Sequence, residues 1–260
     1  MLERLETHRR RLARGLSALC VLLSSAVAIR AQALERPPAP NTEWEVPADA
    51  PWNEGLYVIG DSISFMVPYT ETARALGEKV WQRAGFGWST YGHRNKLWGQ
   101  SLLSSFEDAA RSPARVVFVE LGTNDTACMR AGGWCGSDFP ATPEAANAER
   151  WRMLSEVLAA AQRLTDAGKC VLWAGPREID RPDSGVAEPR AFNQMLRTVQ
   201  GMFPGRFFYV DYNQYTIDNQ ALRDSLDNVP GADRIHPATA EGRQAIANLA
   251  FWLGRLRCGL

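Results

Sequence analysis

The sequence is poor in the residues and motifs that bind metals or nucleotides. It contains only three histidines and five cysteines, and none of them stand at the spacing of a zinc site. It has neither a phosphate-binding loop nor a Gly-x-Gly-x-x-Gly motif, which argues against a nucleotide-binding protein. The nucleophile elbow Gly-x-Ser-x-Gly is absent too, because the nearest match, GDSIS at residues 60–64, ends on serine. We therefore expect no metal and no cofactor.

The sequence also has no excess of positive or negative charge. The whole chain has 29 basic and 29 acidic residues. Its first 33 residues hold six arginines and two acidic residues, so the rest has 23 basic and 27 acidic residues and a net charge of about −4. Nucleic-acid binding requires a basic surface, so we expect no nucleic-acid partner.

The apolar run near the N-terminus is typical of a targeting segment. Four arginines between positions 9 and 14 precede a mostly apolar run at residues 15–29. The run is shorter than the roughly 20 residues that span a membrane, and Ala-Gln-Ala at residues 31–33 matches a cleavage site before Leu34. We predict that residues 1–33 are a signal peptide and that the protein is exported, either periplasmic or secreted. An uncleaved segment would instead anchor it to the membrane.

In an exported protein, the number of cysteines indicates whether disulfides form. Four remain after the signal segment, and an even number in an exported chain indicates disulfides. Cys128 and Cys135 are close in sequence with glycines between them, and we predict that they pair, with a stabilisation of about 2.5 kcal/mol in the chain-entropy picture. Two interpretations remain for Cys170 and Cys258: they form a second disulfide, or Cys170 is a buried free thiol in an apolar strand.

The middle of the chain alternates between strand and helix patterns. Residues 34–53 hold five prolines and predict an extended linker. Continuous apolar runs follow, of a kind that suits strands buried on both faces of a parallel sheet. These runs lie at residues 56–59, 115–121, 169–174 and 206–210, and a further short strand is expected at residues 78–83. With helices between them, they predict one α/β domain over residues 54–260, built as a three-layer α/β/α sandwich.

Two helices can be delimited from their end signals. Thr142 and Pro143 predict a capped start, and Gly168 predicts the end of the same helix. A last helix is expected from about Thr239, with Leu256 on its apolar face. Three tryptophans are expected in the core: Trp151, Trp173 and Trp252.

Short polar segments follow three of the expected strands. Ser62 comes just after the first strand, Asn124 just after the third, and Asp233 and His236 after the fifth. Because the carboxyl ends of parallel strands meet at one edge of the sheet, we expect these residues to lie close together. A serine nucleophile, an amide donor and a histidine oriented by a carboxylate are what acyl transfer requires.

Each of these residues also has a plainer interpretation. A serine in Gly-Asp-Ser can cap a helix, and an asparagine in Gly-Thr-Asn-Asp can form a turn. Their common edge favours the catalytic interpretation: Ser62 as nucleophile, His236 as base and Asp233 as its partner. The developing oxyanion would be held by the Ser62 backbone, the Asn124 amide and the backbone of Gly87. Asp125 is expected to hold the turn around Asn124.

Read in order, these strings resemble the blocks of the SGNH (GDSL-type) hydrolase family. Ser62 in Gly-Asp-Ser is similar to the family's nucleophile, and Asn124 in Gly-Thr-Asn-Asp to its oxyanion asparagine. His236 and Asp233 in Asp-x-x-His-Pro are similar to its base and the partner of that base. Gly87 looks like the oxyanion glycine, with Gly85 as the competing choice. The resemblance covers about residues 54–256.

The resemblance implies a flavodoxin-like parallel sheet of five strands and hydrolysis of esters or thioesters without a metal. Acetylated sugars, lipids and acyl thioesters are the family's substrates, and export disfavours the cytosolic thioesters. We therefore predict a monomeric serine esterase that acts on a small-molecule or glycan ester, most often an O-acetyl ester of carbohydrate, and that associates with the cell envelope.

Two other functions fit the same residues. One is an O-acyltransferase, in which a sugar hydroxyl replaces water as the acceptor. The other is a non-catalytic envelope-binding protein, against which the complete set of serine, asparagine, histidine and aspartate argues, because binding alone does not require it.

Overall fold

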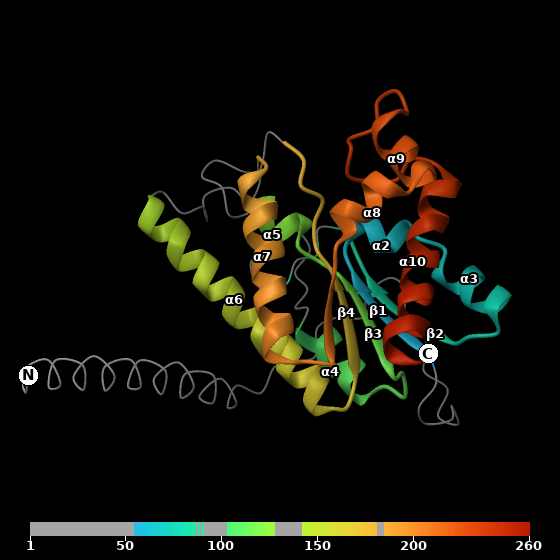
Figure 1. Ribbon diagram of the computed structural model, residues 1–260, viewed down its shortest axis with the longest axis horizontal. Coiled ribbons are helices and arrows are strands. Elements are labelled where there is room, and N and C mark those ends of the chain that lie inside the picture. Colours follow the sequence, from blue (N-terminus) through green and yellow to red (C-terminus); the bar gives the residue numbers. More distant parts are fainter. Residues whose placement is uncertain (1–54, 87, 89, 91–102, 128–141, 181–184) are drawn as a thin grey trace, which may run out of the picture. The chain divides into compact units, whose positions relative to one another are not determined.

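Five parallel strands form the centre of the protein. A computed structural model describes residues 55–86, 88, 90, 103–127, 142–180 and 185–260 (Figure 1). The strands run in the order β2-β1-β3-β4-β5, and every pair of neighbours is parallel. Their bounds are β1 Leu56–Gly60, β2 Val80–Ala84, β3 Val116–Glu120, β4 Cys170–Ala174 and β5 Phe207–Val210. All five predicted strands are present within two residues of the predicted bounds, and the order is that of a flavodoxin-like sheet.

The inner strands β1, β3 and β4 are buried because their side chains point alternately to two covered faces. On β1, Tyr57 and Ile59 belong to one core cluster, whereas Leu56 and Val58 belong to the other. Both clusters continue across β3 and β4. This is why these inner strands read as nearly continuous apolar runs and not as alternating ones.

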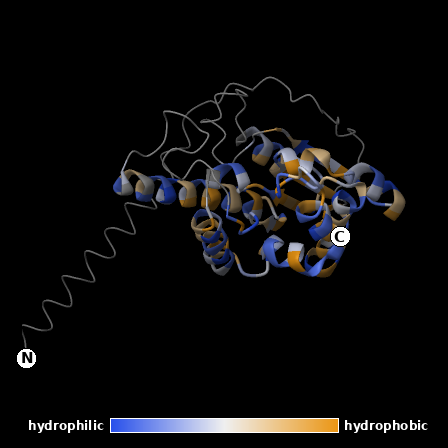
Figure 2. Cartoon of the chain, turned by 90° about the horizontal axis from the view of Figure 1, so that it is seen from above, coloured by the Kyte–Doolittle hydropathy of each residue, from blue (hydrophilic) through white to orange (hydrophobic). Residues whose placement is uncertain are grey.

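Helices cover each face of the sheet and complete the three layers (Figure 1). The first core cluster is closed by residues of α4 Leu103–Arg111, α6 Pro143–Asp166 and α7 Ala187–Met202. The second is closed mainly by α2 Ser62–Met66, α3 Tyr69–Leu76, α9 Gln220–Asp227 and α10 Ala240–Cys258. The helices carry both hydrophilic and hydrophobic residues, as expected for elements that face the sheet on one side and water on the other (Figure 2). The predicted α/β/α sandwich is confirmed.

The predicted helix ends are borne out at both delimited helices. Thr142 accepts from the Ala145 backbone N–H at 3.2 Å and caps α6. Thr239 accepts from the Gly242 N–H at 3.1 Å and caps α10. Gly168, two residues past the end of α6, has the positive φ of 79° that favours glycine.

Several expectations about the helices were wrong. Trp151 on α6 is 62% exposed and Trp252 on α10 is 59% exposed, whereas Trp173 on β4 is buried as predicted. Leu256 also faces outward. Both tryptophans lie on the water-facing sides of long helices, where periodicity over a few residues does not fix the boundary of the apolar stripe. The segment between β5 and the last helix contains two further short helices, α8 Tyr212–Asp218 and α9, which the sequence analysis did not predict.

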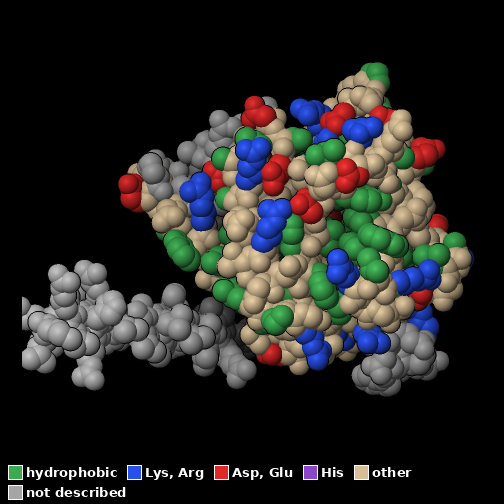
Figure 3. Space-filling model, viewed as in Figure 1, with side chains coloured by type: hydrophobic (Ala, Val, Ile, Leu, Met, Phe, Trp, Pro, Cys, Tyr) green, Lys and Arg blue, Asp and Glu red, His purple; other side chains and the backbone are tan. Residues whose placement is uncertain are grey.

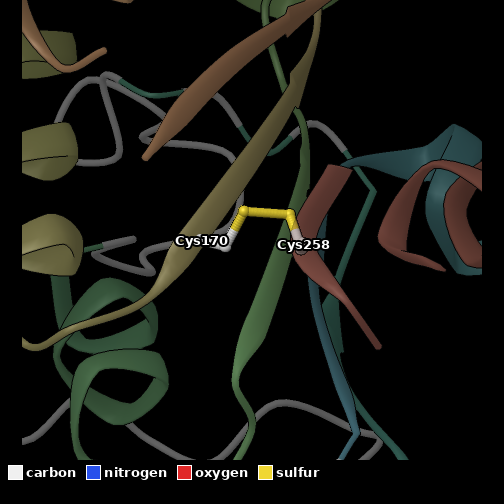
Figure 4. Close-up of a disulfide and its surroundings, with 2 residues drawn as sticks. All are labelled: Cys170 and Cys258. Atoms are coloured by element: carbon white, nitrogen blue, oxygen red, sulfur yellow. A yellow bond between two sulfur atoms is a disulfide. The ribbon is translucent and has the colours of Figure 1, made fainter. Parts of the chain in front are cut away.

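A disulfide joins Cys170, at the start of β4, to Cys258, at the end of α10 (Figure 4). It settles the choice left open by the sequence, because Cys170 is not a free thiol. The Cys128–Cys135 pair lies outside the described residues and stays a prediction.

The surface carries charges of both signs. On the face seen in Figure 3, basic and acidic side chains are interspersed, with hydrophobic side chains among them. Among the residues that the structure describes, no helix combines the length and the apolar character needed to cross a membrane.

Candidate active site

The polar strings named from the sequence meet at the carboxyl edge of the sheet. Ser62 is the first residue of α2, directly after β1, and Asn124 lies in α5 Thr123–Ala127, directly after β3. β1 and β3 are neighbours on either side of the point where the strand order reverses, which is where such sheets bind ligands. Asp233 and His236 lie between α9 and α10 and approach the same edge.

Ser62, His236 and Asp233 form a continuous hydrogen-bonded row. The Ser62 Oγ lies 2.7 Å from His236 Nε2, and His236 Nδ1 lies 2.5 Å from Asp233 Oδ2. Ser62 is only 6% exposed, whereas the side chains of His236 and Asp233 are 33% and 49% exposed, so the row runs from a buried serine to a carboxylate at the surface. With the Nδ1 proton directed at the carboxylate, Nε2 is the nitrogen that can accept from the serine.

Local geometry brings α2 close to the end of β1. A Cβ on Gly60 would lie 2.2 Å from the Cβ of Ser64, so only glycine lets the chain turn so tightly before the serine. Asp61 is the N-cap of α2, and its Oδ1 accepts from the Ile63 N–H at 2.8 Å. The serine is therefore held in the first turn of a capped helix.

The Asp233 carboxylate also shapes its own loop. Its Oδ1 accepts from the backbone N–H groups of Ile235 at 2.9 Å and His236 at 2.8 Å. Burial by itself raises the pKa of Asp233, but these backbone bonds and the imidazole outweigh it and hold the pKa below its ordinary value. The carboxylate facing the histidine therefore stays charged.

Two arginines and an aspartate brace the same loop, and the sequence analysis missed them. Arg177 donates to both carboxylate oxygens of Asp227 and, at 3.1 Å, to the carbonyl oxygen of Arg234. Arg234 in turn donates to Asp227 at 3.2 Å. Arg234 has a φ of 66°, the left-handed region that a non-glycine residue rarely adopts. No motif signals this brace, because Arg177 and Arg234 are 57 residues apart.

The Asn124 amide points into the site but already has partners. Its Nδ2 donates to the Trp88 carbonyl at 2.7 Å and to Asp61 Oδ2 at 3.2 Å. An amide nitrogen has two N–H bonds, so both are used, and the longer bond to Asp61 is the weaker of the two. An oxyanion would therefore share this N–H with Asp61.

The glycine segment after β2 is only partly described. Gly87 lies outside the described residues, so its expected part in the oxyanion hole stays a prediction. Gly85 donates its N–H to the Gly60 carbonyl at 3.3 Å, which extends the pairing of β1 and β2. Because that N–H is used within the protein, Gly85 is the poorer of the two candidates.

Asp125 has the structural contact expected of it. It is fully buried in α5, and its Oδ2 accepts from the Thr90 N–H at 3.0 Å. This bond ties the segment after β2 to the helix after β3.

Comparison with known proteins identifies the family. The sequence pattern that defines the GDSL-like lipase/acylhydrolase family matches residues 58–245, more than half of the chain. The chain belongs to this family. Lipases and acylhydrolases cleave ester bonds, so the chain's relatives are ester-hydrolysing enzymes. No curated protein matches the sequence of this GDSL-like chain.

Solved structures share the GDSL-like fold at low sequence identity. A GDSL-like lipase from Bacteroides thetaiotaomicron matches with a TM-score of 0.51 and 16% identity, over 76% of this chain and 86% of its own. The C-terminal catalytic domain of peptidoglycan O-acetyltransferase A from Streptococcus pneumoniae matches with 0.50 and 14%, over 80% and 96%. A catalytic mutant of an acetylxylan esterase from Geobacillus stearothermophilus matches with 0.50 and 15%, over 80% and 94%. At such identities the likeness shows the fold alone.

A small pocket opens beside the row of polar residues in this GDSL-like chain. Ile63, Thr123 and Ile235 line it, and each is the sequence neighbour of a residue in the row or of Asn124. Pro176, Arg177 and Ile179 after β4 and Tyr212 after β5 complete its walls. Its free volume is about 10 Å³, close to what a single water needs.

A metal has no evident set of ligands here. Across the described parts of the chain, no three or more His, Cys, Asp or Glu side chains are grouped so that they could hold a metal ion.

Proposed function

We propose that this GDSL-like chain is an exported serine esterase that hydrolyses short-chain esters, above all O-acetyl esters of carbohydrate. The observation that carries the proposal is the row from Ser62 Oγ through His236 to the charged Asp233. Contacts of this length match the order nucleophile, base and orienting carboxylate.

The chemistry follows from that row. His236 takes the proton of Ser62 through Nε2 as the serine oxygen attacks the ester carbonyl, and Asp233 stabilises the imidazolium that forms. The oxyanion is held by the backbone N–H groups of Ser62 and Gly87 and by the Asn124 amide. The alcohol leaves with the proton from His236. Water then attacks the acyl-enzyme, gives its proton to His236, and the acid leaves as Ser62 recovers its proton.

The pocket beside Ser62 supports a short acyl group. Its free volume is about 10 Å³, close to what a single water needs, so the space is narrow. Its walls include the apolar side chains of Ile63 and Ile235, and its one charged lining residue, Arg177, is paired with Asp227. A short acyl group fits so small a space more easily than a long one, so we expect activity to fall as the acyl chain grows.

Hydrolysis of p-nitrophenyl acetate, butyrate and octanoate tests the proposal. The protein should hydrolyse acetate fastest, and the folded Ser62→Ala variant should lose this activity. Ser155→Ala, which alters an exposed serine on α6, is the matched control and should keep it. A folded Ser62→Ala variant with full activity would show that another group is the nucleophile. The N-terminus of the exported protein, read by mass spectrometry, should be Leu34.

The acyltransferase alternative is separated by the acceptor. An acetyltransferase shares the fold, so the fold does not decide between water and a sugar hydroxyl. With an acetyl donor and a soluble glycan both present, hydrolysis yields free acetate in proportion to the donor consumed. Acetylated glycan formed at the expense of acetate would favour transfer.

A further inference from the structure

Two carboxyl groups lie buried side by side beneath Ser62. Asp61 follows β1 and Glu120 ends β3, and neither is more than 3% exposed. The two strands are paired with Gly60 opposite Glu120, and the Asp61 N–H donates to the Glu120 carbonyl at 3.3 Å. The mechanism above uses neither carboxyl group as acid, base or nucleophile.

The two carboxyl groups hold the groups that the reaction uses. Asp61 accepts from the Ile63 N–H in the helix that begins at Ser62, and from the Asn124 amide. Glu120 Oε2 accepts from the Ser64 N–H at 3.2 Å and from the Ser64 Oγ at 3.1 Å. The pair therefore joins the helix of the nucleophile to the oxyanion asparagine.

Such a pair cannot carry two negative charges without water, so it keeps one proton. Burial, the charge of Asp61 and a hydrogen bond between the two carboxyl groups raise the pKa of Glu120 well above its ordinary value. Asp61 caps the N-terminus of α2, where backbone N–H groups favour the charged form. Glu120 is therefore the proton carrier and donates to Asp61.

The other titratable groups around Asp61 and Glu120 do not change the assignment of the proton to Glu120. Tyr69 from α3 and Tyr212 from α8 face it, and burial raises the pKa of both phenols, so they stay neutral. The positive charge of Arg177 lowers the pKa of Tyr212 but does not outweigh its burial, and Arg177 is paired with Asp227. None of these three residues places a positive charge beside Glu120 that would offset a second negative charge.

We propose that Glu120 is a positioning residue that stays protonated and, through its hydrogen bond to Asp61, fixes the helix of Ser62 and the amide of Asn124 for catalysis. This inference rests on the proposed function, because it concerns the same site. Loss of the proton at high pH would set two negative charges together, loosen the hold on Asn124 and lower turnover before the fold is lost.

The test compares Glu120→Gln with Glu120→Leu. Glutamine keeps an oxygen that accepts from Ser64 and an N–H that donates to Asp61, but it has no proton to lose. We expect its kcat for p-nitrophenyl acetate at pH 7 to stay within about threefold of the original, and its alkaline fall in kcat to shift upward or vanish. Leucine offers neither bond, so kcat should fall about 10²-fold with little change in KM. Glu241→Gln, an exposed glutamate on α10, is the control.

A spectroscopic measurement gives a readout that does not depend on activity. The infrared difference spectrum of the original protein minus Glu120→Gln at pH 7 should contain the band of a protonated carboxyl group. The proposal would be overturned if this band were absent. It would also be overturned if kcat fell at the same alkaline pH in the original protein and in Glu120→Gln. If Glu120→Leu does not fold, these two results from Glu120→Gln still decide.

A failure of the proposed esterase function would give a different experimental result from a failure of the Glu120 proposal. A folded Ser62→Ala variant that stays active in the same assay would remove the esterase mechanism, whatever Glu120 does. An inactive Ser62→Ala variant beside an unchanged pH profile in Glu120→Gln would leave the mechanism standing and reduce Glu120 to packing.

Discussion

At the scale of single residues, the Asp233 carboxylate combines two tasks, since one oxygen closes its own loop and the other faces the imidazole. An Asp233→Asn change separates them. The amide oxygen can still accept from the loop backbone, but the amide N–H₂ facing Nδ1 would require the other tautomer of His236, which cannot accept the serine proton.

We therefore expect Asp233→Asn to lower kcat by roughly 10²-fold or more with a smaller change in KM. Steady-state kinetics on p-nitrophenyl acetate measure this. Asp166→Asn, at the exposed end of α6, should leave kcat unchanged. Equal activity of the two variants would mean that Asp233 serves only the loop.

The raised pKa of Glu120 makes the stability of the folded protein depend on pH. Its pKa is raised in the folded protein by burial and by Asp61, whereas an unfolded chain loses the proton near pH 4.5. Above that pH the folded state holds one more proton than the unfolded state, so the free energy of unfolding falls as pH rises towards the raised pKa.

Glu120→Gln removes this dependence. The difference in unfolding free energy between Glu120→Gln and the original protein should grow in favour of the variant, by at most about 1.4 kcal/mol per pH unit above pH about 4.5. Urea titrations at several pH values from 5 to 8 measure it. Parallel stability curves would mean that Glu120 is already ionised in the folded protein.

At the scale of elements, the loop between α9 and α10 depends on contacts from another segment. Arg177, after β4, holds the Arg234 carbonyl, and both arginines share Asp227. The pKa of Asp227 is lowered by its hydrogen bonds with Arg177 in the first place, so the brace is charged at neutral pH. It holds Arg234 in a strained backbone conformation next to the catalytic histidine that we propose.

We expect Arg177→Ala to lower kcat about 10- to 10²-fold, because a small displacement of His236 from Ser62 is enough to slow the reaction. The double variant with Asp227→Asn should lose little more than Arg177→Ala alone, since the two residues act together. Steady-state kinetics and circular dichroism of the three proteins test this. Losses that multiply would indicate two independent roles.

The elements that were predictable are those whose signals are local. β3 and β4 are runs of apolar residues, and α6 begins at a threonine followed by proline and ends before a glycine. α8 and α9 were not anticipated, because helices of 7 and 8 residues carry too few turns for a clear period. The exposure of Trp151 and Trp252 depends on which face of a long helix meets the sheet.

At the scale of the whole molecule, the Cys170–Cys258 disulfide ties a central strand to the last helix across a separation of 88 residues. Cys170 begins β4, so the bond lies at the amino edge of the sheet, opposite the edge that carries Ser62. A cross-link at that edge should affect stability and leave the site geometry alone.

Replacing both Cys170 and Cys258 by alanine should lower the free energy of unfolding by about 4–5 kcal/mol on the chain-entropy estimate for so long a loop. Turnover of p-nitrophenyl acetate by the folded variant should change less than about twofold. Denaturant unfolding and kinetics on the same preparation test both statements. A large loss of turnover in the folded variant would show that the two edges of the sheet are coupled.

The sequence by itself determined the strands, the long helices and the residue types of the site, because burial pattern, end signals and motif order are local properties. It also indicated that Ser62, Asn124 and His236 share one edge, since parallel strands end together. Only the tertiary structure decided the contacts that join distant segments: the Cys170–Cys258 bond, the Arg177 brace and the burial of Asp61 beside Glu120. Each depends on distance and on exclusion of water, and these properties arise only when the chain packs.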